Sequence, residues 1–236
     1  YVCRELKKEF PDLLSYTRFV ERIPRVAIPL LLFLKLGLMG ECTGITFIDS
    51  TRIPVCENKR QSRNRVFKGY AQKGKSTMGW YYGFKLHLLC NERGELLNFA
   101  LTRANVDDRN PKVFNDLTKD LFGKLYADKG YISQSLFASL FDRGVHIVTG
   151  IRTNMKNRLM DVHDKIMLRK RSIIETINDM LKNVAQIVHT RHRSISNFIV
   201  NLLAGIAAYA FYDTKPSINM EFEREEKQGV KQLTLF

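Results

Sequence analysis

Three carboxylates stand where they could act together on a phosphate ester. Asp49 closes the apolar run ITFID, Asp128 follows the apolar run KLYA, and Glu175 lies on an amphipathic stretch. Close carboxylates repel one another unless a cation neutralises them, and a hard, oxygen-preferring metal such as Mg²⁺ does so while leaving sites for phosphate oxygens and water. Two such ions, roughly 3.5–4 Å apart, can activate an attacking oxygen and stabilise a leaving one. The three residues therefore suggest metal-dependent phosphoryl transfer.

The stretch from Arg171 to His189 predicts one amphipathic helix. Apolar residues recur at three- and four-residue spacing and form a core-facing stripe: Ile174, Ile177, Leu181, Val184 and Val188. A polar stripe runs beside it: Arg171, Glu175, Asn178, Lys182 and His189. Taken alone, this stripe reads as a solvated face with salt-bridge spacing. The two aspartates reverse that preference, so that Arg171 and Lys182 suit phosphate contacts while Asn178 and His189 have no role beyond nearby DNA contact.

Short strands and intervening helices must position these carboxylates. The patterns predict strands at 45–49, 80–90, 95–102, 124–127 and 145–149, and helices at 109–121, 133–143, 171–189 and 197–212. Three antiparallel strands, followed by a crossover to two parallel strands with helices on the faces, make a ribonuclease H-like α/β fold. The first and fourth strands are neighbours in such a sheet, so Asp49 and Asp128 should approach each other. An aspartate after a buried strand can equally be a residue that caps a helix or turn rather than a residue of a functional site.

The chain divides into three parts. Residues 1–44 predict a helical segment packed on the next part, residues 45–212 the catalytic domain, and residues 213–236 a flexible tail. The chain begins at Tyr1 without methionine, so we expect N-terminal sequence to be missing. Two details complete the prediction: residues 150–170 should be basic and irregular, and Asp107 or Asp108 should cap the helix at 109–121.

The charge of the chain points to a polyanionic partner. With 38 Lys and Arg against 24 Asp and Glu, the net charge is +14, which favours nucleic acid first and an anionic membrane surface second. The candidate DNA-contacting cations lie mainly between residues 57 and 79, where Phe67 and Tyr70 are available for stacking. They are Lys59, Arg60, Arg63, Arg65, Lys68, Lys73 and Lys75, with Arg171, Lys182, Arg191 and Arg193 further on. A solvated basic loop is the plainer alternative.

The sequence disfavours membrane-spanning, secreted, zinc-binding and disulfide-bonded proteins. The longest apolar run, 27–39, is too short to span a bilayer, which needs roughly 20 residues, and no signal peptide is visible. The four cysteines show no paired spacing, which disfavours zinc sites and disulfides and fits a reducing compartment. We therefore expect a cytoplasmic, nucleoid-associated protein with no membrane partner.

Five segments in order resemble a known family. They are FIDST at 47–51, FKGYAQKGKSTMGWYYGFKLHL at 67–88, ANVDDR at 104–109, YADKGY at 126–131, and RSIIETINDMLKN with HTRHRS at 171–194. The chain resembles a bacterial insertion-sequence transposase of the DDE type over about residues 5–212, closest to the group named after insertion sequence 982. The related insertion-sequence-4 group carries a Tyr, Arg, Glu, Lys signature, which Arg171, Glu175 and Lys182 match in spacing while Leu168 replaces the tyrosine.

The resemblance implies an activity and its partners. Asp49, Asp128 and Glu175 would be the catalytic triad, binding two Mg²⁺ ions, or Mn²⁺ in their place. The protein would cleave double-stranded DNA at the terminal inverted repeats of a transposon and then join the freed 3′-hydroxyl to target DNA. Family members act as dimers or larger assemblies on paired ends, so a homodimer is expected.

The last five residues resemble a separate docking motif. QLTLF at 232–236 is similar to the pentapeptide by which bacterial replication and repair proteins bind the DNA polymerase sliding clamp, with Gln232, Leu233, Leu235 and Phe236 as the contacts. Two leucines and a phenylalanine after a polar linker suit insertion into an apolar pocket. A frayed apolar end is the alternative.

Two other functions remain open from the sequence. One is a different ribonuclease H-like nuclease, such as a junction resolvase, which would cut branched DNA and ignore terminal repeats. The other is a catalytically silent, DNA-binding remnant of a transposase, which would bind DNA without product in any metal.

Overall fold

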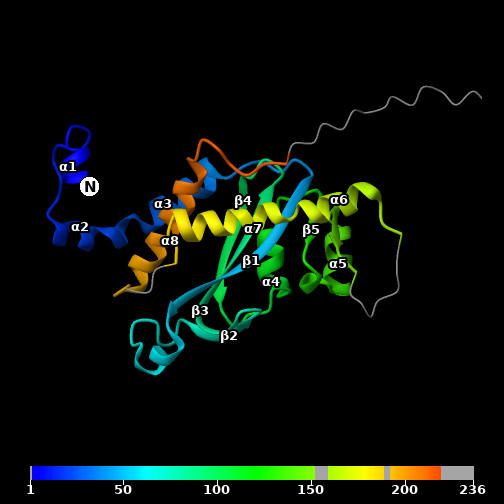
Figure 1. Ribbon diagram of the computed structural model, residues 1–236, viewed down its shortest axis with the longest axis horizontal. Helices are drawn as coiled ribbons and strands as arrows, with labels where there is room; N and C mark the ends of the chain where they lie inside the picture. The colour runs from blue at the N-terminus through cyan, green and yellow to red at the C-terminus, as the bar shows by residue number, and fades with distance from the viewer. Residues whose placement is uncertain (1, 152–158, 189–191, 219–236) are drawn as a thin grey trace, which may run out of the picture.

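A single mixed sheet carries the fold, which Figure 1 shows in a computed structural model that describes residues 2–151, 159–188 and 192–218. Its strands are β1 (Ile45–Cys56), β2 (Gln72–Ser76), β3 (Gly79–Asn91), β4 (Leu96–Arg103), β5 (Gly123–Ala127) and β6 (Val145–Thr149). β3 pairs antiparallel with β1 on one side and with β2 and then β4 on the other, while β1, β5 and β6 run parallel. Three antiparallel strands followed by two parallel ones confirm the ribonuclease H-like prediction.

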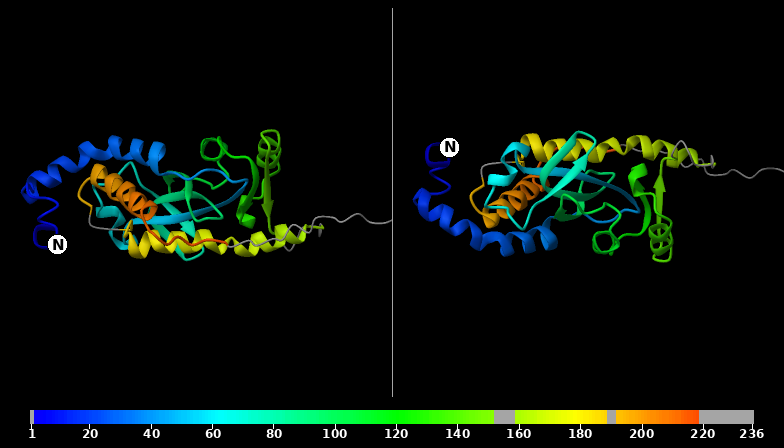
Figure 2. Two further views of the ribbon diagram at one scale, coloured as in Figure 1. Left: turned by 90° about the horizontal axis from the view of Figure 1, so that it is seen from above. Right: turned by 90° about the horizontal axis from the view of Figure 1, so that it is seen from below.

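Helices cover both faces of this sheet. They are α1 (Val2–Glu5), α2 (Tyr16–Arg22), α3 (Ala27–Phe33), α4 (Pro111–Leu117), α5 (Gln134–Phe141), α6 (Val162–Lys170), α7 (Ser172–Asp179) and α8 (Ile195–Ala210). Short 3₁₀ turns occur at η1 (Ile23–Val26), η3 (Asn58–Arg63) and η4 (Lys129–Tyr131), and π turns at η2 (Leu34–Leu38) and η5 (Met180–Val184). In Figures 1 and 2, α6 and α7 follow each other along the molecule, and α7 crosses β1.

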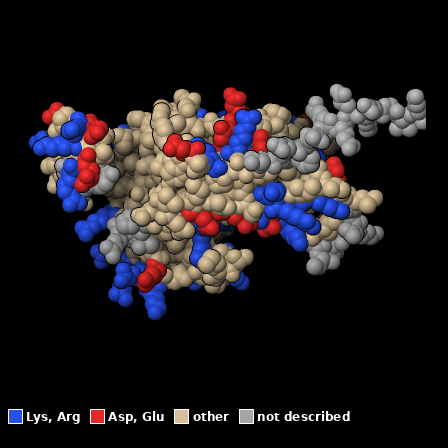
Figure 3. Space-filling view, turned by 45° about the horizontal axis from the view of Figure 1, so that its top comes forward, with Lys and Arg blue, Asp and Glu red and all other residues tan. Residues whose placement is uncertain are grey.

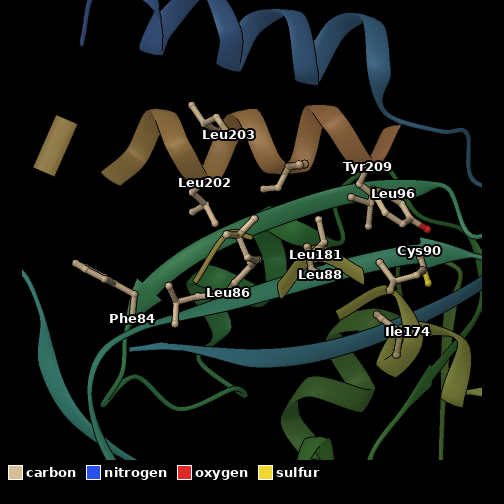
Figure 4. Close-up of a cluster of buried hydrophobic side chains, with 14 of the residues drawn as sticks. Phe84, Leu86, Leu88, Cys90, Leu96, Ile174, Leu181, Leu202, Leu203 and Tyr209 are labelled. Atoms are coloured by element: carbon tan, nitrogen blue, oxygen red, sulfur yellow. The ribbon is translucent and has the colours of Figure 1, made fainter. Parts of the chain in front are cut away.

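Alternation along the strands divides the core between the two faces. Phe47 belongs to the cluster under α7 and α8, whereas the next residue, Ile48, belongs to the cluster under α4 and α5. Figure 4 shows Leu86 and Leu88 of β3 packed against Leu181 and against α8, with α3 on the far side of α8. Asp49 shares the parity of Phe47, so its side chain lies on the face that α7 covers.

The predicted first strand was too short. It was expected to end at Asp49, but pairing of β1 with β3 continues to Cys56, so Asp49 lies inside the strand. What ends near Asp49 is the parallel pairing with β5, whose last pair joins Phe47 to Tyr126. Strand β2 was missed altogether because its sequence, QKGKS, is polar, and it forms by pairing with β3 across the turn before Gly79.

Two predictions about helix starts were also wrong. Residues 162–170 were expected to be irregular but form α6, because Asp161 caps the helix by accepting a hydrogen bond from the His163 amide. Helix α4 is capped by Asn110 rather than by Asp107 or Asp108, since Pro111 fixes its first residue. Asp107 instead accepts hydrogen bonds from the backbone amide and the guanidinium of Arg109.

The helix predicted from Arg171 to His189 ends early. α7 passes into the π turn η5, and Gln186 then adopts a positive φ of 51°, which a helix cannot accommodate. Val184 is consequently 63% exposed rather than part of the buried stripe, and Val188 is not helical. His189 lies outside the described residues.

The N-terminal segment is helical, as predicted, but packs only in part. Figure 1 shows α1 and α2 extending away from the sheet, while α3 lies against α8. Phe10 and Phe19 in this segment are more than half exposed.

His87 of β3 is buried, and its side chain has a hydrogen-bond partner. Its Nε2 lies 2.9 Å from Thr102 Oγ1, and its Nδ1 lies 3.8 Å from Asp108, which also pairs with Lys85. Burial lowers the pKa of His87 to about 4, although Asp108 opposes this shift and Lys85 adds to it. The imidazole is therefore neutral in the folded protein at pH 5, where an unfolded histidine is protonated.

This difference predicts a loss of stability in acid. Between pH 6.5 and 4.5 the unfolded chain binds the extra proton, so the free energy of unfolding should fall by roughly 2–3 kcal/mol on account of His87 alone. Urea unfolding at pH 7.5 and 4.5, compared between wild type and His87→Gln, measures this contribution. The variant should lose less stability on acidification, and an identical loss in both proteins would contradict the assignment.

Candidate active site and nucleic-acid interface

The sheet brings Asp49 and Asp128 to neighbouring positions. β1 and β5 are paired up to Phe47 and Tyr126, and two further residues along each strand are Asp49 and Asp128. Because alternate residues share a face, both aspartates lie on the face of Phe47 and Tyr126. Asp128 directly follows β5, as predicted, is exposed, and accepts a hydrogen bond from the Lys129 amide at 2.7 Å.

Glu175 of α7 and Arg171, the residue just before that helix, lie beside β1. The Arg171 guanidinium donates to Glu175 Oε1 at 2.7 Å, and its other terminal nitrogen lies 3.9 Å from Asp49 Oδ1. Arg171 is only 18% exposed, whereas Glu175 is 55% exposed. The predicted salt-bridge spacing is therefore real, and Arg171 bridges two of the three carboxylates rather than facing solvent alone.

Asn178 is the site residue whose role the sequence did not reveal. It lies one turn after Glu175 and donates from Nδ2 to Asp49 Oδ2 at 2.9 Å. Its side chain is buried, and its Oδ1 has no hydrogen-bond partner among the described residues. The sequence placed Asn178 on the polar stripe beside Glu175. Only the packing of α7 on β1 shows that its hydrogen-bond partner is Asp49.

Asp49 is harder to ionise than an ordinary carboxyl group. Its pKa is raised to about 6, chiefly by burial and to a smaller extent by the charges of Glu175 and Asp128, against the lowering effect of Arg171 and of the Ser50 amide. Asp49 resists ionisation because Arg171 and the Ser50 amide offset only part of its desolvation. A cation at this edge would relieve that cost.

The donor set suits a hard divalent cation. All the candidate ligands, namely the three carboxylates and the unpartnered Asn178 oxygen, are oxygen atoms, as Mg²⁺ and Mn²⁺ prefer. Across the described ranges, no group of three or more His, Cys, Asp or Glu side chains is gathered closely enough to hold a metal. Arg171 instead supplies the positive charge between Asp49 and Glu175.

Of the other predicted contacts near this edge, the structure describes two. Lys182 is half-buried on η5, and its pKa is lowered by burial, although Asp179 and Asp49 oppose the shift. Arg193 is exposed just before α8, whereas Arg191 lies outside the described residues.

The basic segment at 57–79 presents its cations to solvent. All seven predicted members are exposed, and among the described residues none of them pairs with a carboxylate: Lys59, Arg60, Arg63, Arg65, Lys68, Lys73 and Lys75. Three of these, Lys59, Arg60 and Arg63, line a hollow of about 640 Å³ together with Cys56, Glu57 and Asn64. On the face shown in Figure 3, Lys and Arg form separate groups with carboxylates between them.

Phe67 anchors this segment to the core. It was expected to be available for stacking on bases, but it is buried and packs edge-on against Phe84 and Phe198. Its carbonyl accepts a hydrogen bond from the Tyr82 hydroxyl at 3.1 Å. Tyr70, by contrast, is 55% exposed. The segment is therefore held in place rather than being a loose basic loop.

A ribonuclease H-like sheet with an acidic edge and an unpaired cationic segment is typical of proteins that act on nucleic acids. A family model described as a transposase DDE domain matches residues 39–195. The chain therefore belongs to this family of DDE transposases. No helix in the described ranges has the length and apolar character needed to cross a membrane.

Comparison with curated proteins yields no match. Among solved structures, piggyBac transposase in a synaptic complex with hairpin DNA is 11% identical, covers 72% of this chain and 47% of that chain, and has a TM-score of 0.48. The Mos1 strand transfer complex is 10% identical, covers 87% and 68%, and has a TM-score of 0.29. This chain thus spans about half the length of the piggyBac chain. Both TM-scores lie below 0.5, so neither likeness assigns a residue or an activity to this chain.

Proposed function

We propose that this DDE transposase cleaves DNA at the terminal inverted repeats of an insertion sequence and joins the freed 3′-hydroxyl to target DNA. The observation that carries the proposal is the packing of α7 on β1 beside the end of the β1–β5 pairing, where Arg171 lies 2.7 Å from Glu175 and 3.9 Å from Asp49. The motifs FIDST, YADKGY and HTRHRS support placement in the insertion sequence 982 group.

We infer that Asp49, Asp128 and Glu175 would hold two Mg²⁺ or Mn²⁺ ions. When bound, such ions supply activation of the attacking oxygen and stabilisation of the leaving one. The protein's own part is to hold the carboxylates at one edge, with Asn178 fixing the Asp49 side chain by its hydrogen bond. Arg171 and Lys182, the cations on the same stripe, suit contacts with the phosphates beside the scissile bond.

The direct test uses DNA that carries the element's own ends. A duplex ending in the terminal repeats should be nicked at the repeat boundary in Mg²⁺ or Mn²⁺, leave a 3′-hydroxyl, and be joined to a target plasmid. Chelation of the metal should stop both steps. Cutting of branched DNA regardless of repeats would instead indicate a junction resolvase, and binding without product in any metal would indicate a silent remnant.

The partners of this activity follow from the same proposal. Two copies of the chain would act as a homodimer on paired ends, with the basic segment on double-stranded DNA. Sliding-clamp binding through 232–236 also remains a proposal, because those residues lie outside the described part of the chain.

The basic segment should set the salt dependence of DNA binding. Each lost phosphate contact lowers the slope of log affinity against log salt by about 0.9, so Lys59→Gln/Arg60→Gln/Arg63→Gln should lower it by roughly 2–3. Anisotropy of a labelled duplex at several salt concentrations, without metal, measures this slope. The matched control removes the same charge from exposed N-terminal positions, as Lys7→Gln/Lys8→Gln/Arg18→Gln. An equal change of the salt slope in both triple variants would contradict the placement of duplex DNA on the basic segment.

A further inference from the structure

Trp80, the only tryptophan in the chain, stands exposed on a basic hairpin. Strands β2 and β3 pair antiparallel, with Lys75 directly opposite Trp80 and Lys73 two residues along the same strand. Paired and alternate residues project from one face, so the two lysines and the indole share a face of the hairpin. Trp80 is 53% exposed, which is unusual for the largest apolar side chain.

The two lysines stay close to the indole ring. Lys73 Nζ lies 5.1 Å and Lys75 Nζ 5.9 Å from the ring centroid, which is within cation–π range. In the described ranges neither ammonium has a carboxylate partner. An aromatic face flanked by uncompensated cations matches a nucleotide, whose base can stack while its phosphate takes the charge.

A hollow of about 440 Å³ adjoins this group and carries a net positive charge. Its lining holds four cations, Lys73, Lys75, Lys85 and Arg109, and two anions, Asp107 and Asp108. Each anion is already paired, Asp108 with Lys85 at 2.9 Å and Asp107 with Arg109 at 2.8 Å. The two remaining charges, those of Lys73 and Lys75, are therefore available to an anionic ligand.

The hairpin is seated firmly enough to form a site. Asn58 donates from Nδ2 to the Trp80 carbonyl at 2.7 Å, and a Cβ built on Gly74 would lie 2.3 Å from the Ala104 carbonyl oxygen. Such close packing fixes the backbone that carries Trp80, which reduces the ordering required on binding. Gly130, two residues after Asp128, also lines the hollow, which places it beside the candidate catalytic edge.

We propose that this hollow binds an unpaired nucleotide of single-stranded DNA, with its base stacked on Trp80 and its phosphate on Lys73 and Lys75. A base inside a duplex is already stacked on its neighbours, so a single aromatic platform selects unstacked DNA. The inference rests on the proposed function, since an unpaired strand beside the scissile bond is the substrate it would hold. It gives Lys73 and Lys75 a role distinct from the duplex contacts of the other five cations in the basic segment.

The lone tryptophan makes the site directly observable. Without divalent metal, oligothymidylate should quench the emission of Trp80 in the full chain, and a blunt duplex should quench it much less. In anisotropy with the same labelled oligonucleotide, Trp80→Ala should weaken single-strand binding by roughly 5- to 150-fold, the usual effect of losing one stacked base. Trp80→Phe should retain most of the affinity, and duplex binding should be unchanged in both variants.

Tyr16→Ala provides the matched control because Tyr16 is an exposed aromatic on α2, outside the basic segment. Unchanged Trp80 emission, an equal loss in Tyr16→Ala, or an equal loss of duplex binding in Trp80→Ala would overturn the inference. Circular dichroism verifies that the variants are folded. If transposon ends are cleaved but oligothymidylate does not change the emission of Trp80, this inference alone fails. If Trp80 binds single-stranded DNA but no metal supports cleavage, the proposed function alone fails.

Discussion

Replacing Asp49 with asparagine should lower the rate of end cleavage by at least about a thousandfold. The loss of one oxygen ligand and its charge removes roughly 4 kcal/mol of transition-state stabilisation, on the scale of 1.36 kcal/mol per tenfold in rate. Asp128→Asn and Glu175→Gln should behave alike, because the proposed mechanism has all three carboxylates hold the same ions. Single-turnover cleavage of a labelled terminal-repeat duplex, with Mn²⁺ as well as Mg²⁺, measures the effect.

Stability and DNA binding serve as the controls for this loss. A carboxylate whose pKa is raised from 3.8 to about 6 in the folded protein loses stability as the pH rises between these two values, and the loss is complete above the second, so Asp49→Asn should unfold no more easily than wild type at pH 7.5. Duplex binding in chelator should also persist. Cleavage at the wild-type rate in any of the three variants would remove that residue from the site.

Substitution of Asn178 by leucine should lower cleavage by about 10- to 100-fold. The amide that holds Asp49 Oδ2 is lost, whereas the volume of the buried side chain is kept, and partners of metal ligands are commonly worth this factor. Because Asn178 acts through Asp49, the concentration of Mn²⁺ needed for half-maximal rate should rise. A titration of rate against Mn²⁺ separates this effect from a simple loss of folded protein.

Thr176→Ala is the matched control on the same helix. Thr176 is exposed, and its hydroxyl donates to the Ser172 carbonyl within α7, so its removal should leave both the rate and the metal requirement unchanged. If Asn178→Leu cleaves as fast as Thr176→Ala at every Mn²⁺ concentration, the hydrogen bond to Asp49 has no catalytic importance.

Local patterns were sufficient for most of the sheet. The strand at 145–149 was predicted with its observed ends, and those at 80–90 and 95–102 to within one residue, because alternating apolar residues are a strong signal when one register buries them. Secondary structure was predicted wrongly in two situations. Strand β2 forms by pairing with β3 although its residues are polar, and helix α6 begins where it does because the single side chain of Asp161 caps it.

The candidate site was predicted in outline by the same route. Asp49 and Asp128 could be placed together because the strand order makes β1 and β5 neighbours, and Glu175 because of its spacing on an amphipathic helix. The partners of these residues could not be predicted. Helical periodicity places Arg171 and Asn178 on a stripe, but it does not say at what rotation and height α7 crosses β1.

The sequence by itself determined the class of fold, the family, the acidic positions and the cationic segment, since these depend on residue types and on periods of 2 and 3.6. Only the tertiary structure decided which partners each side chain has: Arg171 between two carboxylates, Asn178 on Asp49, Phe67 in the core, and Trp80 over a charged hollow. The physical reason is that burial and pairing are properties of contacts between distant segments, which local spacing does not contain.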